Sequence, residues 1–202
     1  CAGAPNGDAL VDDCGICNGG NADDLGCGCF EDAPSGCDDT CGSALENDDC
    51  GVCGGDGTTC LATLSLGAFD SSGSLEILYD FGSDILGFQF DVSGLALTGG
   101  SGGAAGDAGF MVSVGDDSVL GISLTGGTIS AGSGVLTVLS FSDITADATE
   151  LSLGNSGAVV SSDGSTTLDL SFEGSIDHGD QDCAGSYYGD AWESDCGCVA
   201  AD

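Results

Sequence analysis

The chain has 202 residues, of which 34 are Asp or Glu and none is Lys or Arg, giving a formal net charge of −34 at pH 7. So acidic a surface repels nucleic-acid phosphates and anionic membranes, and the missing lysine and arginine exclude Schiff-base chemistry and side-chain clamps for phosphate. No apolar run approaches the ~20 residues of a membrane span. We therefore expect neither a nucleic-acid partner nor membrane insertion.

The cysteines divide the chain into three segments. Ten of the 13 lie within residues 1–60, none within 61–182 and three within 183–198. We predict a Cys-rich head (1–60), a middle domain (61–176) and a Cys-rich tail (177–202). The head has too few large apolar residues for an ordinary core and needs covalent or metal staples. This density of cysteine favours an oxidising compartment, so we expect a secreted protein of the cell surface or surroundings.

All the cysteines are candidates for structural disulfides: Cys1, Cys14, Cys17, Cys27, Cys29, Cys37, Cys41, Cys50, Cys53, Cys60, Cys183, Cys196 and Cys198. The CxxC spacing in the head also suits zinc thiolates, but the oxidising context favours disulfides. An odd number leaves one cysteine unpaired, bonded to another chain or bonded to a residue outside this sequence.

One segment of the head carries a recognisable motif. Residues 48–60 read DDCGVCGGDGTTC. This run resembles the Cys-rich repeats of secreted microbial surface proteins. The resemblance implies spacers or staples and says little about activity.

The middle domain reads as short strands separated by clusters of Gly, Ser and Asp. Phe88, Phe90 and Val92 alternate with Gln89 and Asp91, the pattern of a half-buried strand. Further strands are predicted at 61–68, 75–81, 110–114, 119–124, 135–141, 158–160 and 168–172, with turn clusters that include 98–103. Residues 143–150 could hold one helical turn. Strands at this spacing predict an all-β fold, an antiparallel β-sandwich or jelly roll.

Two runs of the middle domain carry a second resemblance. Residues 85–92 read ILGFQFDV and residues 130–141 read SAGSGVLTVLSF. They resemble the paired strand motifs of cohesin-like β-sandwich modules. The resemblance implies this fold and a module that binds a dockerin or serves passively on a surface, with no site residue to transfer.

Acidic pairs recur beside the cysteines on Gly-rich loops, where hard oxygen ligands could bind Ca²⁺. The candidate ligands are Asp12, Asp13, Asp48, Asp49, Asp177, Asp180 and Asp182. The alternative is that these carboxylates only solvate an acidic protein. No other cofactor is expected.

The tail repeats the head. Cys1–Gly15 (CAGAPNGDALVDDCG) aligns without gaps to Cys183–Gly197 (CAGSYYGDAWESDCG). Tyr187, Tyr188 and Trp192 replace smaller head residues, so they are candidates for an interface or for stacking on a glycan, or else form the tail's own small core. His178, the one histidine, is expected to be an exposed linker residue without a catalytic role.

These observations predict a non-enzymatic structural subunit of an extracellular fibre or surface matrix. Its Cys-rich ends would join copies head to tail. The alternative is a binding or adhesion module of a larger surface protein, which recognises a protein or a glycan. A compact apolar patch on one face of the sandwich would favour the alternative.

Overall fold

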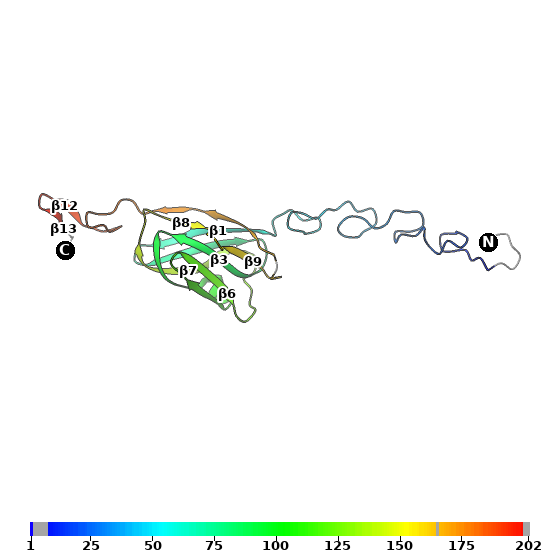
Figure 1. Ribbon diagram of the computed structural model, residues 1–202, viewed down its shortest axis with the longest axis horizontal. Helices are drawn as coiled ribbons and strands as arrows, with labels where there is room; N and C mark the ends of the chain where they lie inside the picture. Colours follow the sequence, from blue (N-terminus) through cyan, green and yellow to red (C-terminus); the bar gives the residue numbers. More distant parts are fainter. Residues whose placement is uncertain (2–7, 165, 200–202) are drawn as a thin grey trace. The chain divides into compact units, whose positions relative to one another are not determined.

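The computed structural model describes residues 1, 8–164 and 166–199 (Figure 1). The chain forms two compact units, Cys1–Gly57 and Thr58–Asp202. In its described residues the first unit consists of turns and isolated β-bridges, whereas the second contains a β-sandwich and the tail. The tail, predicted as a separate segment, thus belongs to the same unit as the sandwich.

The sandwich consists of two sheets. One has the strand order β10-β1-β2-β7-β4 and the other β11-β8-β3-β6-β5, with β9 also paired to β3. All the pairs are antiparallel except β1 with β10. The strands are β1 (Leu61–Asp70), β2 (Ser74–Phe81), β3 (Ile85–Ser93), β4 (Leu95–Ser101), β5 (Phe110–Val114), β6 (Ser118–Ser123), β7 (Gly132–Ile144), β8 (Ala148–Ser152), β9 (Ala158–Ser161), β10 (Asp169–Glu173) and β11 (Ser175–Asp177).

Alternation along the strands builds the core between the sheets. In β3, Phe88, Phe90 and Val92 are buried, while Gln89 and Asp91 are half-buried on the other face. Strands of the opposite sheet supply Leu64, Leu75, Ile77, Leu136 and Leu139 to the same core. The all-β prediction, with an antiparallel sandwich and disulfide-rich ends, is confirmed.

Two local predictions were wrong. Residues 98–103 were expected to form a turn, but β4 runs to Ser101 and the short helix α1 (Gly103–Asp107) follows. Gly100 lies in β4, where any side chain would clash, because a Cβ atom there would come within 2.6 Å of Val112. Residues 143–150 form no helical turn, because Thr149 and Leu151 are buried with the period of two that defines β8.

In the described part of the chain, no helix is long and apolar enough to cross a membrane. The only α-helix there, α1, spans five residues and buries Ala105. Helices therefore contribute little to the fold.

The packing of Phe88 generates a stability prediction. Gly121 is paired with Phe88 across β6 and β3, and a Cβ atom on Gly121 would lie 2.1 Å from the Phe88 ring. We expect Gly121→Ala to destabilise the sandwich by about 1–3 kcal/mol through overpacking. Urea unfolding without reductant, monitored by far-UV circular dichroism, measures the change.

Gly99→Ala is the matched control, because Gly99 also lies in a strand but has no atom within 4 Å of the added methyl group. Its midpoint should stay close to that of the parent chain. Equal midpoints for the two variants would contradict the packing argument.

Candidate functional site

The cysteines of the head form a chain of overlapping disulfide loops, which we call the disulfide ladder. Its bonds are Cys1–Cys17, Cys14–Cys29, Cys27–Cys41 and Cys37–Cys53, each closing a separation of 14–16 residues. Cys50 and Cys60 are disulfide-bonded as well. A loop of this length contributes about 3 kcal/mol in the chain-entropy model. The ladder therefore supplies the stability that a hydrophobic core would otherwise provide.

The pairing has a direction. Four pairs of cysteines close in sequence define four turns. In the turns with Cys14 and Cys17, with Cys27 and Cys29, and with Cys37 and Cys41, the first cysteine bonds forward and the second bonds backward. Cys27, for example, bonds forward to Cys41, while Cys29 bonds backward to Cys14. The two middle turns are thus fastened both to the turn before and to the turn after.

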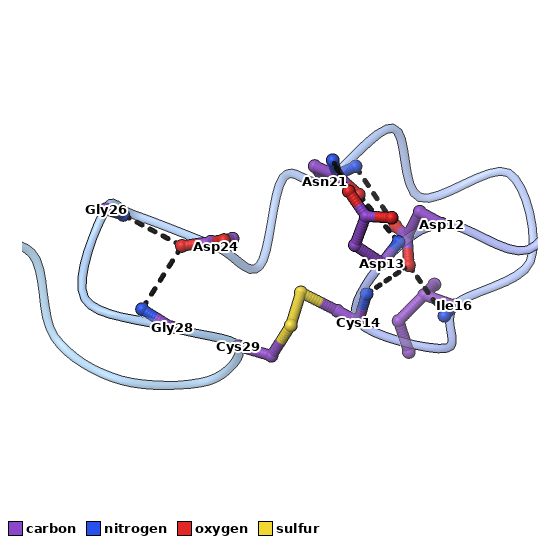
Figure 2. The surroundings of a disulfide bond; sticks show 9 residues. All are labelled: Asp12, Asp13, Cys14, Ile16, Asn21, Asp24, Gly26, Gly28 and Cys29. Atoms are coloured by element: carbon purple, nitrogen blue, oxygen red, sulfur yellow. Dashed lines mark hydrogen bonds between the residues drawn. A yellow bond between two sulfur atoms is a disulfide. The ribbon is translucent and has the colours of Figure 1, made fainter.

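Within these loops, a carboxylate organises the backbone. Asp12 Oδ1 accepts hydrogen bonds from the N–H groups of Cys14 and Ile16 at 3.1 and 2.8 Å, and its Oδ2 accepts one from Asn21 at 3.0 Å. Figure 2 shows this turn joined through Cys14–Cys29 to a smaller turn, in which Asp24 accepts from Gly26 and Gly28. We call the first arrangement the aspartate turn.

The aspartate turn occurs three times in the described residues. Asp48 accepts from the N–H groups at positions 50, 52 and 57, and Asp182 accepts from those at 184, 186 and 191, the same offsets of two, four and nine. Each turn also has a hydrogen bond from the N–H three residues after the aspartate to the aspartate's own carbonyl. The third copy lies in the tail, so head and tail share a turn of defined geometry.

Glycine at one position makes the turn possible. Gly19, Gly55 and Gly189 lie seven residues after the three aspartates, and a Cβ atom on any of them would come within 2.0–2.2 Å of the carboxylate. The residue before each has positive φ: Asn18, Gly54 and Tyr188. The signature D-x-x-G-x-x-x-G would have found all three turns in the sequence. Sequence analysis missed it because aligning the cysteines paired Cys183 with Cys1, whereas the aspartate turn pairs Asp182 with Asp12.

These contacts bear on the predicted calcium ligands. Asp12, Asp48 and Asp182 direct their carboxylate oxygens at backbone N–H groups, Asp13 accepts from the Asn21 side chain, and Asp177 accepts from Gly179 N–H. In the part of the chain that the structure describes, no group of three or more His, Cys, Asp or Glu side chains is placed to hold a metal ion. The structure brings none of the predicted ligands, which include Asp49 and Asp180, into such a group. Calcium binding stays a prediction.

The aspartate turn predicts acid sensitivity. Backbone hydrogen bonds, from Val52 first, lower the pKa of Asp48 below its ordinary value, and those from Ser186 first lower that of Asp182. A lowered carboxyl pKa stabilises the turn above the unfolded pKa of about 3.8, and this contribution is lost as pH falls through the folded value. The turns of Asp48 and Asp182 should therefore loosen below about pH 3.8, which amide exchange at different pH measures.

Asp48→Asn tests the same contacts at neutral pH. The amide replaces one accepting oxygen by an NH₂ group, so the N–H groups of Val52 and Gly57 cannot both be satisfied. We expect faster amide exchange at these two residues and faster reduction of Cys37–Cys53 by dithiothreitol. Asp49→Asn changes the same charge at the adjacent residue and is the control. Equal exchange and reduction rates in the two variants would contradict a structural role for Asp48.

A buried histidine fastens the tail to the sandwich. His178 is 4% exposed, which shows that the expected exposed linker was wrong. Its Nε2 is hydrogen-bonded to Thr149 Oγ1 of β8 at 2.8 Å, and its Nδ1 to the Tyr188 hydroxyl at 3.0 Å. Its ring packs against Phe69 of β1 with centroids 5.1 Å apart. The polar sequence around His178 concealed this site, because the partners come from β1 and β8.

The two tyrosines complete this contact. The Tyr187 hydroxyl donates to Asp147 at 2.5 Å, and the hydrogen bond raises the pKa of Tyr187. Tyr188 packs near Phe69, with ring centroids 6.1 Å apart. Trp192, in β12 (Trp192–Ser194), pairs with Val199 of β13 (Gly197–Val199) and is 58% exposed. The structure thus places the tyrosines against the sandwich and leaves Trp192 open to solvent.

Tyr187 occupies a linking position of the aspartate turn. It lies five residues after Asp182, where the head turns have Cys17 and Cys53. Those cysteines bond backward, to Cys1 and Cys37. In the tail the same position makes its backward contact to Asp147 of the sandwich by a hydrogen bond. The repeat therefore conserves the linking position while the chemistry of the link differs.

The histidine contact makes a pH prediction. Burial lowers the pKa of His178, and the neighbouring Asp177 opposes this shift. A lowered histidine pKa stabilises the contact fully above the unfolded value of about 6.5, and the stabilisation is lost as pH falls through the folded value. Because the sequence has one histidine, its imidazole NMR signal can be followed without assignment. We expect a midpoint below 6.5 that rises in Tyr188→Ala. A midpoint that is unmoved by this substitution would contradict the contact.

An apolar patch lies on the outer face of the six-stranded sheet. Met111 of β5 is paired with Ile122 of β6, and Leu120 of β6 is paired with Ser113. Met111 is 49% and Leu120 37% exposed, and Ile122 is half-buried. We call these three side chains the outer patch. It lies on a face of the sandwich, away from the tail contact with β1 and β8.

Comparison with known proteins found a partial similarity to a solved structure. No family model matches the chain, and no curated protein matches its sequence. Among solved structures, a non-cellulosomal cohesin from the hyperthermophilic archaeon Archaeoglobus fulgidus is similar over 55% of this chain and 86% of its own, with a TM-score of 0.40 and 15% identity. This likeness assigns no site or partner to the chain.

Proposed function

We propose that this protein is a non-enzymatic structural subunit of an extracellular assembly, in which Cys-rich ends connect β-sandwich bodies. The observation that carries the proposal is the directional disulfide ladder, with an aspartate turn of the same geometry in both head and tail. Repeated units that fasten only to their neighbours suit an extended object. The density of disulfides also suits secretion into an oxidising environment.

Charge sets the requirement at the joints. The first 60 residues carry 13 carboxylates and residues 177–202 carry seven, with no Lys or Arg to offset them. Two such ends repel each other over roughly 10 Å at 0.1 M salt. Assembly therefore needs screening by salt, bound cations such as Ca²⁺, or burial of apolar surface. The exposed Trp192 ring offers apolar surface in the tail.

Sedimentation velocity and electron microscopy of the oxidised chain test the proposal. We expect species larger than the monomer that increase with protein concentration and with salt or Ca²⁺. Trp192→Ser should weaken the association. Leu124→Ser is the matched control, because Leu124 is 71% exposed but follows strand β6 of the sandwich and is not part of the tail strands β12 and β13. A chain that stays monomeric in every condition would rule the proposal out.

The outer patch supports a second candidate function, a binding module of a larger surface protein. The patch consists of aliphatic and thioether side chains, which suit an apolar protein segment, whereas a glycan would call for aromatic rings. If the double variant Met111→Ser, Leu120→Ser abolishes association while Trp192→Ser leaves it unchanged, the sandwich face is the contact surface. That result would favour the second candidate.

A further inference from the structure

The tail repeats a continuous block of the head in structure. An aspartate turn comes first, at Asp12 in the head and at Asp182 in the tail. A CxC turn follows, Cys27-Gly28-Cys29 in the head and Cys196-Gly197-Cys198 in the tail. The order of the two turns is the same.

Three observations make the CxC turns equivalent. Gly28 and Gly197 both have positive φ, 115° and 109°. Cys29 bridges to Asp24, five residues before it, and Cys198 pairs with Glu193 at the same spacing. Finally, Cys29 bonds backward to Cys14 and Cys198 bonds backward to Cys183, each over a separation of 15 residues.

The equivalence singles out Cys196. Its counterpart Cys27 bonds forward to Cys41 over 14 residues. The first cysteines of other turns, Cys14 and Cys37, also bond forward. Cys196 is exposed and is the one free cysteine of the described residues. The other linking positions have a link in the tail, since Cys198 bonds backward to Cys183 and Tyr187 makes a backward contact at the position of Cys17.

We propose that Cys196 is the next rung of the ladder and forms a disulfide with a cysteine thiol of another Cys-rich turn, outside residues 1–202 of its own copy. The thiol belongs to a further repeat of the same polypeptide or to a second copy of the chain. The proposal rests on the proposed function in treating the tail as a connecting end, and it names the connecting atom, Cys196 Sγ.

The reaction balances with a small-molecule disulfide as oxidant, such as oxidised glutathione. The Cys196 thiolate attacks one sulfur of the oxidant and releases one glutathione thiolate. The thiolate of the second turn then attacks the Cys196 sulfur of this mixed disulfide and releases the second glutathione. Two protein thiols lose two electrons, and the oxidant is reduced to two glutathione molecules that take up the two protons.

Two forms of the full chain distinguish the sources of the thiol. The first is the chain itself. The second is extended at Asp202 by a copy of residues 34–41 in which Cys37→Ser leaves one cysteine, fourteen residues after Cys196 as Cys41 is after Cys27. Both are incubated with reduced and oxidised glutathione in ~0.5 M salt, which screens the repulsion between copies. Gels without reductant and mass mapping of peptides identify the bonds.

In the extended chain we expect Cys196 to bond to the added cysteine. At ~10 µM protein this closure should exceed dimer formation about 100-fold, because a short loop gives an effective concentration near 1 mM. In the chain itself we expect a reducible dimer through Cys196. Cys196→Ser should remove both products. Closure of the extended chain with no dimer of the chain itself identifies a further repeat as the source, and a dimer of the chain itself shows that a second copy can supply the thiol.

The proposal is overturned if Cys196 is recovered in both forms as a free thiol, as a glutathione adduct or as a reshuffled bond to Cys183 or Cys198. Mapping of Cys183–Cys198 shows in each case whether the tail has kept its fold. Sedimentation separates this result from the proposed function. If Cys196→Ser assembles as the parent does, the proposed assembly holds without the Cys196 disulfide. If the disulfide forms but nothing larger than a dimer appears, the Cys196 disulfide holds and the proposed assembly fails.

Discussion

The structure depends on how a chain without cationic side chains accommodates its carboxylates. With no Lys or Arg in the sequence, an ordered carboxylate has to take its hydrogen bonds from N–H and hydroxyl groups. The aspartate turn meets this requirement with three backbone N–H groups for each side chain. The same bonds satisfy amides that a turn without sheet or helix partners would leave to solvent. The carboxylate and the backbone N–H groups thus stabilise each other within segments of fewer than a dozen residues.

The two units solve the problem of stability differently. The sandwich buries a continuous core of aromatic and aliphatic side chains between its sheets, including Phe81, Phe88 and Phe90. The head leaves its large apolar residues open, with Leu10 78% and Phe30 66% exposed. It relies on aspartate turns within each segment and on disulfides between segments. An end that is stabilised in this way can be repeated without enlarging a core, since each turn contacts its neighbours alone.

The sequence predicted the fold well where one residue pattern decides the structure. Alternation located β3, and the density of cysteine indicated stapled ends. It failed where the decisive partner is distant in sequence. His178 looked exposed because its neighbours are polar, but Thr149 and Phe69 bury it. Gly100 looked like part of a turn because its close contact, Val112, lies on another strand. The aspartate turn is a different case, since its signature is local. It was overlooked because the cysteines that guided the alignment occupy other positions in the tail.

The tail combines the two solutions. Its aspartate turn and its Cys183–Cys198 bond belong to the chemistry of the head, while Tyr187, Tyr188 and His178 join it to the sandwich by hydrogen bonds and ring contacts. A link of this kind opens without a redox reaction, whereas a ladder bond does not. We therefore expect the contact between tail and sandwich to respond to pH through the buried His178, whereas a ladder bond responds to redox potential. The direction of the ladder is retained in the tail, because Cys198 bonds backward to Cys183 as Cys29 does to Cys14, and Tyr187 takes the position of the backward-bonding Cys17.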